Sequence, residues 1–77
     1  MKKKIALPKL SDEMKSAVLC AWLKQEGEEY KKGEPIYEIE TEKVISQVEA
    51  EEDGIMVHQL VEEGDEVSVG AELAEVE

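Results

Sequence analysis

Residues 35–48 of this 77-residue chain read PIYEIETEKVISQV. The runs 35–39 and 44–48 are rich in β-branched and aromatic residues, and the polar stretch 40–43 connects them. This pattern predicts a β-hairpin with Lys43 at its tip. Tight hairpins usually carry Gly, Asn or Pro at the connection, and none is present in this one. We therefore interpret Lys43 as the working residue, an amine that a rigid hairpin presents to other proteins.

The chain contains an internal repeat. Residues 18–40 (VLCAWLKQEGEEYKKGEPIYEIE) align without gaps on residues 55–77 (IMVHQLVEEGDEVSVGAELAEVE), and seven of 23 pairs are identical. Both glycines of each copy match, and so do most apolar positions. Each copy is predicted to read strand, Gly turn, short strand, Gly turn, strand, because glycine supplies the positive φ that tight turns need.

The periodicity predicts an all-β domain. The expected strands span residues 3–8, 17–24, 29–31, 36–41, 44–51, 55–61, 66–68 and 73–76. Neither half could bury its apolar face alone, so we expect two antiparallel sheets related by a pseudo-twofold axis. The first half runs into the 41–43 turn and the second ends at the C-terminus. The two chain ends should therefore meet at one pole, with Lys43 at the other.

Composition excludes several functions. A chain of 77 residues is one small domain that buries only about 60% of its unfolded surface, which leaves no room for a deep substrate cavity. The formal charge of −11 argues against binding to nucleic acid or to an anionic membrane surface. We find no nucleophile–base pair, metal cluster or phosphate loop, so no catalytic or metal-binding residues are predicted.

The single cysteine, Cys20, excludes an internal disulfide and fits a reducing compartment. No apolar run is long enough for a signal peptide core or a membrane span, so a cytoplasmic location is expected. The isolated domain is expected to be a monomer. Cys20 pairs with Val57 in the repeat and is interpreted as a small buried side chain. Met14 either touches the group carried by Lys43 or closes its own loop.

The sequence resembles the lipoyl domains of 2-oxo acid dehydrogenase complexes. The matching run is 36–44, IYEIETEKV, an acidic-Thr-acidic-Lys turn with Gly54 eleven residues after its lysine. The run 7–14, LPKLSDEM, is similar to the opening of dihydrolipoyl acyltransferase subunits. Glu42 and Val44 stand where many members have Asp and Ala. The biotinyl domains share the architecture but place their lysine in Ala-Met-Lys-Met, so biotin is disfavoured on Lys43.

The resemblance implies a flattened β-barrel, or barrel-sandwich hybrid, of two four-stranded antiparallel sheets. It also implies lipoic acid in amide linkage to Lys43, attached by a lipoate ligase or lipoyl transferase. The other implied partners are a thiamin-diphosphate 2-oxo acid decarboxylase, an acyltransferase core and dihydrolipoamide dehydrogenase. The domain itself would be a swinging-arm carrier of acyl groups and electrons, not an enzyme.

The residues around the turn suggest a recognition surface. We hypothesise an acidic rim that the decarboxylase reads, together with the turn residues Thr41 and Val44 and the loop residue Met14. Its predicted members are Asp12, Glu13, Glu40, Glu42 and Glu49. Alternatives that stay open are a biotinyl carrier, a glycine-cleavage lipoyl carrier and an unmodified lipoyl-like structural domain, as in membrane fusion proteins.

Overall fold

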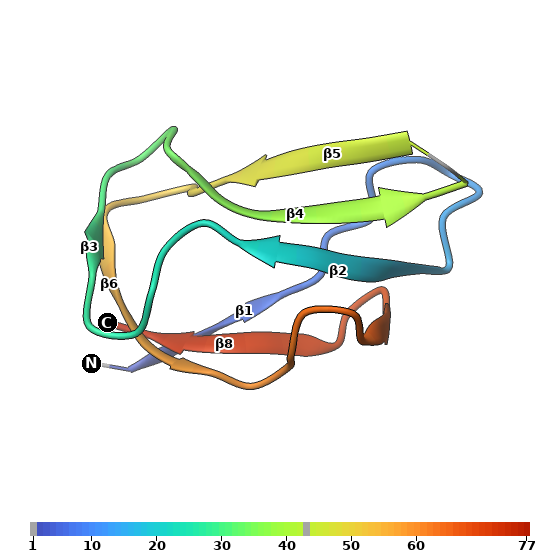
Figure 1. Cartoon of the computed structure of the whole chain (residues 1–77). Coiled ribbons are helices and arrows are strands. Elements are labelled where there is room, and N and C mark those ends of the chain that lie inside the picture. Colours follow the sequence, from blue (N-terminus) through green and yellow to red (C-terminus); the bar gives the residue numbers. More distant parts are fainter. Residues whose placement is uncertain (1, 43) are drawn as a thin grey trace.

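The computed structural model describes residues 2–42 and 44–77, and every regular element in this part of the chain is a strand (Figure 1). The strands are β1 (Lys3–Ala6), β2 (Ser16–Trp22), β3 (Glu29–Tyr30), β4 (Pro35–Thr41), β5 (Val44–Glu49), β6 (Gly54–Gln59), β7 (Glu66–Ser68) and β8 (Glu72–Val76). All eight predicted strands are present, and their ends differ from the prediction by at most two residues.

The strands form two four-stranded antiparallel sheets packed face to face. One sheet has the order β1-β8-β6-β3 and the other the order β5-β4-β2-β7. The repeat relates them, since β2, β3 and β4 of the first half correspond to β6, β7 and β8 of the second. Each sheet therefore contains strands from both halves. The predicted fold class, all-β with two four-stranded antiparallel sheets, is confirmed.

The repeat extends to irregularities in the ladders. The register of β2 against β4 shifts between Leu19 and Ala21, and that of β6 against β8 shifts between Met56 and His58. The extra residues at these two shifts, Cys20 and Val57, occupy equivalent positions of the repeat. Bulges bend strands and re-aim side chains, so matched bulges give the two sheets matched curvature.

The halves exchange equivalent hydrogen bonds at their Gly turns. The Gly27 N–H donates to Met56 O at 2.6 Å, and the Gly64 N–H donates to Leu19 O at 2.7 Å. Both glycines have φ above 90°, and a Cβ at either would meet nothing within 4 Å. Backbone conformation, and not lack of space, is therefore the reason for glycine at these turns.

Glutamates reinforce the same exchange. The Gln59 N–H donates to Glu26 Oε2 at 2.8 Å, and the Trp22 N–H donates to Glu63 Oε2 at 2.9 Å. Glu26 and Glu63 are an identical pair in the repeat, and each accepts a hydrogen bond from a backbone N–H of the other half. This equivalent hydrogen bond explains why both copies carry glutamate at this position.

The core lies between the sheets and follows the repeat as well. Ile36, Tyr37 and Ile39 of β4 are buried, and so are their equivalents in β8. The largest fully buried side chains are Leu7, Leu19, Tyr37, Ile39, Met56 and Leu73. Trp22 is buried too, with its ring edge-on to Tyr37 at 5.7 Å between centroids and its Nε1–H donating to Val61 O.

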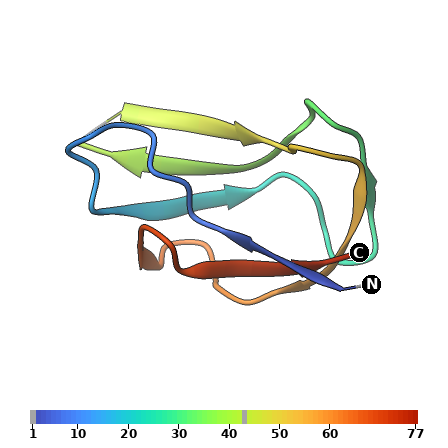
Figure 2. The same ribbon diagram turned by 180° about the vertical axis from the view of Figure 1, so that it is seen from behind.

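The two ends of the described chain lie together at one pole. Lys3 of β1 pairs with Val76 of β8, and the β4–β5 connection lies at the opposite end of the molecule (Figures 1 and 2). The molecule extends over 32 × 21 × 18 Å. The chain ends were predicted to lie at the pole opposite the β4–β5 connection. This holds for the described residues that flank position 43.

The expected burial of Cys20 is wrong. The repeat pairing with Val57 is correct, but both side chains are only half-buried. Cys20 is the extra residue of a bulge between the buried Leu19 and the half-buried Ala21. A bulge interrupts the alternation of buried and exposed positions, so the pattern of neighbouring residues does not predict this side chain.

Candidate functional site: the β4–β5 turn

The turn that follows β4 is tight. Thr41 and Val44 pair directly in the β4–β5 ladder, so only positions 42 and 43 connect the two strands. Glu42 has φ of 47°, the left-handed conformation that two-residue hairpin turns require. For a residue with a Cβ this conformation costs roughly 1–2 kcal/mol. Lys43, the predicted attachment residue, lies outside the described residues.

A groove runs beside this turn. It is formed by the β1–β2 loop, β2, the ends of β4 and β5, and β7. Its lining includes Glu13, Met14, Glu40, Thr41, Glu42 and Val44. Six of the predicted recognition residues, distant in sequence, thus share one groove. Asp12 is exposed and lies in the chain between Ser11 and Glu13, which both line it.

Met14 closes the loop that borders the groove. Its side chain is buried, and its Sδ accepts a hydrogen bond from the Leu10 N–H at 3.3 Å. The Met14 N–H donates to Ser11 O at 3.2 Å. Of the two roles considered for Met14, loop closure therefore has a direct structural basis.

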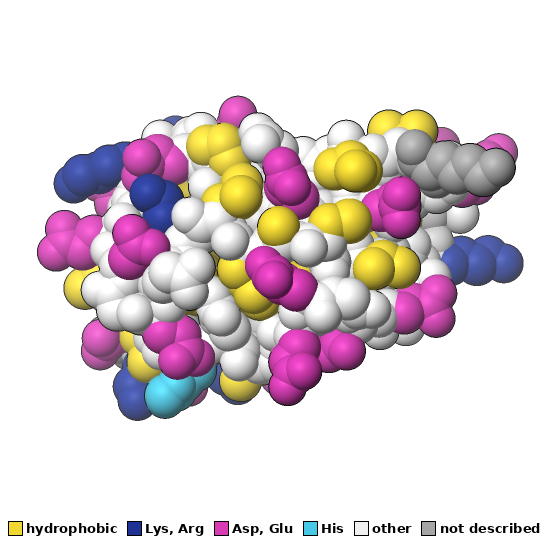
Figure 3. Space-filling model, viewed as in Figure 1, with side chains coloured by type: hydrophobic (Ala, Val, Ile, Leu, Met, Phe, Trp, Pro, Cys, Tyr) yellow, Lys and Arg dark blue, Asp and Glu magenta, His cyan; other side chains and the backbone are white. Residues whose placement is uncertain are grey.

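Acidic side chains surround the turn but also extend beyond it. Glu13, Glu40, Glu42 and Glu66 all line the groove, and Lys15 contributes a positive charge. Figure 3 shows acidic side chains spread over the whole visible face, between isolated hydrophobic ones. The exposed hydrophobic side chains nearest the turn are Val44 and Ile45, each 59% exposed. A partner at this end of the molecule would meet mixed acidic and apolar surface.

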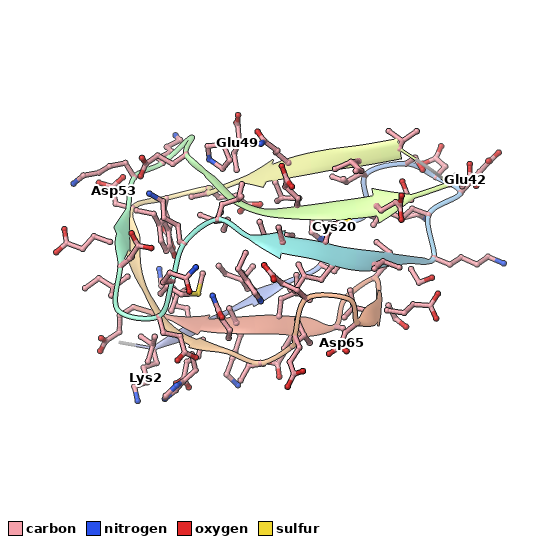
Figure 4. The ribbon with its side chains drawn as sticks, in the orientation of Figure 1. Lys2, Cys20, Glu42, Glu49, Asp53 and Asp65 are labelled. Carbon is pink, nitrogen blue, oxygen red and sulfur yellow. The ribbon has the colours of Figure 1, made fainter. Side chains whose placement is uncertain are left out.

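The placement of Glu49 in the acidic rim is wrong. Glu49 pairs with Pro35 at the far end of the β4–β5 ladder, whereas Thr41 and Val44 pair beside the turn. Figure 4 shows Glu42 and Glu49 at well-separated points along the hairpin. A strand rises about 3.3 Å per residue, so five residues from Val44 to Glu49 span roughly 17 Å.

Close contacts around Gly54, the glycine of the motif, leave no space for a side chain at this position. A Cβ at this position would lie 2.6 Å from Tyr30 Oη and 2.8 Å from the backbone oxygen of Glu77. Its backbone is not in the left-handed region. Glycine eleven residues after Lys43 is thus explained by close packing at the opposite pole, not by the geometry of the turn.

Two other potentially reactive side chains, Cys20 and His58, do not line the groove. Burial, followed by the charges of Glu40 and Glu38, raises the pKa of the Cys20 thiol, which keeps it protonated and unreactive. His58 is exposed, with its Nδ1 3.9 Å from Glu26 Oε2. Within residues 2–42 and 44–77, no group of three or more His, Cys, Asp or Glu side chains could hold a metal ion.

Some groove residues were not predicted. Leu10, Lys15 and Glu66 line it, and Leu10 is 51% exposed. The repeat contained a partial signal for Glu66, because it places residues 66–68 in a short strand. The pairing of this strand with β2 next to the turn could be seen only in the folded sheet.

No helix in the described ranges has the length and apolar character needed to cross a membrane.

The fold and the turn define a small all-β domain that holds one two-residue turn at the pole away from its chain ends. A family model described as "Biotin-requiring enzyme", Biotin_lipoyl, matches residues 3–76. The chain belongs to this family. Two acyltransferase components and one lipoyl domain among the similar proteins agree with the resemblance found from the motif.

Two curated relatives are acyltransferase components. The dihydrolipoyllysine-residue succinyltransferase component of the 2-oxoglutarate dehydrogenase complex of Staphylococcus saprophyticus is 40% identical over 72 residues, 94% of this chain. The dihydrolipoyllysine-residue acetyltransferase component of the acetoin cleaving system of Pseudomonas putida is 39% identical, also over 94% of this chain. The match covers 17% and 20% of these relatives, so this chain spans at most a fifth of their length.

A solved structure supports the same assignment. The lipoyl domain of the 2-oxoglutarate dehydrogenase complex of Azotobacter vinelandii is similar with a TM-score of 0.77 and 34% identity. The match covers 96% of this chain and 94% of that domain. A single-chain, multi-domain long-chain acyl-CoA carboxylase shares the fold, with a TM-score of 0.81 at 19% identity over 7% of its length.

Proposed function

We propose that this domain is a lipoyl carrier, with lipoic acid in amide linkage to Lys43. The observation that carries the proposal is the β4–β5 hairpin, whose ladder continues to Thr41 and Val44 on either side of position 43. The motif resemblance, the family and the lipoyl-domain structure at 34% identity support the same cofactor.

The residues around position 43 fit such a group. Glu42 and Val44 are exposed, and the groove beside them is open. A side chain leaving the turn would therefore meet solvent and not a packed wall. A lysine has a long flexible stem and an amine that can be acylated once it loses a proton from its usual pKa of about 10.4. Amide formation would change the formal charge from −11 to −12.

The bound group would supply the chemistry, namely a dithiolane that carries acyl groups and electrons. The contribution of the protein is position. The turn lies away from the chain ends, so a tether at the ends leaves the turn free to enter other active sites. Tethering on short flexible linkers gives effective concentrations of about millimolar. The shuttle would run between the decarboxylase, the acyltransferase core and the dihydrolipoamide dehydrogenase of a 2-oxo acid dehydrogenase complex.

Intact-mass spectrometry tests the attachment. After incubation with lipoate, ATP and a lipoate ligase, the chain should gain one lipoyl group, and Lys43→Ala should gain none. Lys15→Ala is the matched control, because Lys15 lines the groove beside the turn and should leave the addition unchanged. A lipoyl group that persists in Lys43→Ala would contradict the assignment.

A biotinyl carrier is the second candidate, because the family model includes biotin-requiring enzymes. The flanks of Lys43 are Glu42 and Val44 in place of methionines, which disfavours this function. The same assay with biotin and a biotin ligase separates the two. Biotin addition without lipoyl addition would replace the first proposal, and no addition of either would favour an unmodified structural domain.

We further propose that the decarboxylase reads an acidic rim made of Asp12, Glu13, Glu40 and Glu42. Glu13, Glu40 and Glu42 line one groove, and this concentrates negative charge beside the turn. Reversing the charges of Asp12 and Glu13 to lysine should slow reductive acylation of the lipoylated domain. Lysine at the exposed Glu29 and Glu77, which lie together at the pole of the chain ends, makes the matched control for net charge. Equal rates in both double variants would show that no such rim exists.

A further inference from the structure

The two sheets have four edge strands, and β5 differs from the other three. Native proteins protect edge strands by short length, charged residues or bulges, because unpaired backbone groups invite pairing with another chain. β3 has two residues, β7 has three including Glu66, and β1 carries Lys3, Lys4 and a register shift. β5 has six residues, and the stretch Val44–Val48 contains no charge, proline or glycine. β5 is therefore the least protected of these edges.

The backbone of β5 offers hydrogen-bonding groups along its outer side. β5 is the last strand of its sheet, beside β4 (Figure 1). Thr41 and Val44 flank a two-residue turn, and such residues form a hydrogen-bonded pair. Opposite pairs alternate between bonded and non-bonded, so Ile45 and Gln47 direct their backbone N–H and C=O away from β4. Among the described residues, no other element forms a backbone hydrogen bond with either of them.

The side chains of β5 are accessible as well. None of its six residues is buried, and four of them are exposed. Val44 and Ser46 line the groove beside the turn, and Val48 lines a cavity to which β1 also contributes. Open space therefore accompanies β5 over most of its length, so an extended segment can lie along it without displacing the core.

The charges of the hairpin select the kind of segment. The charged residues of β4 and β5 are all acidic, namely Glu38, Glu40 and Glu49. Glu40 pairs with Ile45 in the ladder, so the two side chains share one face of the sheet. Neighbouring strands lie about 4.8 Å apart, and a lysine or arginine on an added strand can therefore lay its stem over Ile45 and bring its charge near Glu40.

A second copy of this chain fits the edge poorly. Two β5 strands side by side would bring the same acidic residues of both copies together. Each copy has a formal charge of −11, which adds a general repulsion between them. A basic segment of a different protein meets neither obstacle.

We propose that the free edge of β5 is a docking site for an extended, basic segment of another protein, which adds a fifth strand to the β5-β4-β2-β7 sheet. Strand addition draws its affinity from main-chain hydrogen bonds and its specificity from alternate side chains. The backbone of Ile45 and Gln47 supplies the hydrogen bonds, and the acidic side chains of β4 supply the charge. The site requires no modification of Lys43, so it is independent of the carrier function.

Hydrogen exchange on the full chain, followed by nuclear magnetic resonance, tests the site with a defined probe. The probe is a peptide of seven residues that alternates lysine and valine, with both ends blocked. At saturation, exchange of the Ile45 and Gln47 amides should slow by at least about tenfold, because these amides gain hydrogen-bond acceptors. The edge amides of β1 and β7 are the internal control and should not change. General attraction between opposite charges would not protect alternate amides of one strand.

Two variants and a second peptide separate strand addition from general attraction. Ile45→Lys places a protective charge on the edge and should weaken binding of the lysine peptide about tenfold. Leu60→Lys is the matched control, because Leu60 is also an exposed apolar residue but follows β6 in the other sheet. It changes the charge equally and should alter binding by less than about twofold. A peptide with glutamate in place of lysine should bind at least about tenfold more weakly to the wild type.

Four results would overturn the proposal. The first is unchanged exchange at Ile45 and Gln47 at the highest concentration of the lysine peptide. The second is equal binding of the two peptides, and the third is equal loss of binding in Ile45→Lys and Leu60→Lys. The fourth is protection of the same amides that rises with chain concentration in the absence of peptide, which would identify a second copy as the occupant.

The test stays decisive if a variant is lost. If Ile45→Lys does not fold, the exchange rates and the two peptides on the wild-type chain decide, since they require no variant. Lipoylation of Lys43 is measured separately by mass, so failure of the docking site would leave the carrier proposal standing, and the reverse holds as well.

Discussion

Replacing Glu42 by glycine should make the domain more stable. Glu42 has φ of 47°, which costs roughly 1–2 kcal/mol for a residue with a Cβ. Glycine removes this cost but loses about 0.5–1 kcal/mol more chain entropy on folding. The difference of these two ranges is about 0–1.5 kcal/mol, with a central gain of about 0.75 kcal/mol in the free energy of unfolding. This corresponds to about 3–6 °C in melting temperature for a chain of this size.

Glu49→Gly is the matched control. Glu49 is an exposed acid in the same hairpin, so both variants change the formal charge from −11 to −10. Glu49 lies in β5 without a positive φ. Glycine within a strand destabilises by about 0.5–1 kcal/mol, and this variant should therefore lose stability. At the central values the two variants should differ by about 1.5 kcal/mol, in opposite directions from the wild type.

Guanidinium unfolding, followed by circular dichroism and by the fluorescence of the buried Trp22, measures the free energy of unfolding of both variants. Glu42→Asn is expected to stabilise as well, because asparagine tolerates the left-handed region. The reasoning about backbone strain at the turn fails if Glu42→Gly loses as much stability as Glu49→Gly. A confirmed gain would mean that glutamate at this position weakens the hairpin and is present for a reason other than stability, such as recognition by a partner.

Gly54→Ala should lower the free energy of unfolding by more than about 2 kcal/mol, because the new Cβ would lie 2.8 Å from the Glu77 backbone oxygen. Gly70→Ala is the control, because a Cβ there would meet open space and only the positive φ is unfavourable. It should cost about 1 kcal/mol in the same unfolding assay. The pKa of Tyr37 is raised from 10 to about 12 in the folded state, so its contribution to stability is complete below pH 10 and is lost as the pH rises to about 12. Stability measured across this range should fall less steeply in Tyr37→Phe than in the wild type, and equal slopes would refute an ionisation linked to unfolding at Tyr37.

Local chemistry was sufficient for much of the fold. Glycines at 27 and 64 and the apolar residues between them predicted turns and strands, because turn conformation and strand alternation depend on neighbours in the chain. The repeat then predicted two related sheets, since neither half could bury its apolar face alone. The motif around Lys43 predicted the hairpin, and the ladder runs to Thr41 and Val44 as expected.

Bulges and contacts between distant strands decided the rest. Cys20 is half-buried because it is the extra residue of a bulge, and Glu49 leaves the rim because β5 carries it roughly 17 Å from the turn. Glu26 caps the backbone of the opposite half, a role that exists only once the halves pack. A cavity beside Tyr37 likewise exists only because β1 and β5, edge strands of different sheets, both contribute residues to its lining. Sequence patterns report which residues are apolar and where the chain turns, whereas the face and neighbours of each side chain follow from how the strands pack together.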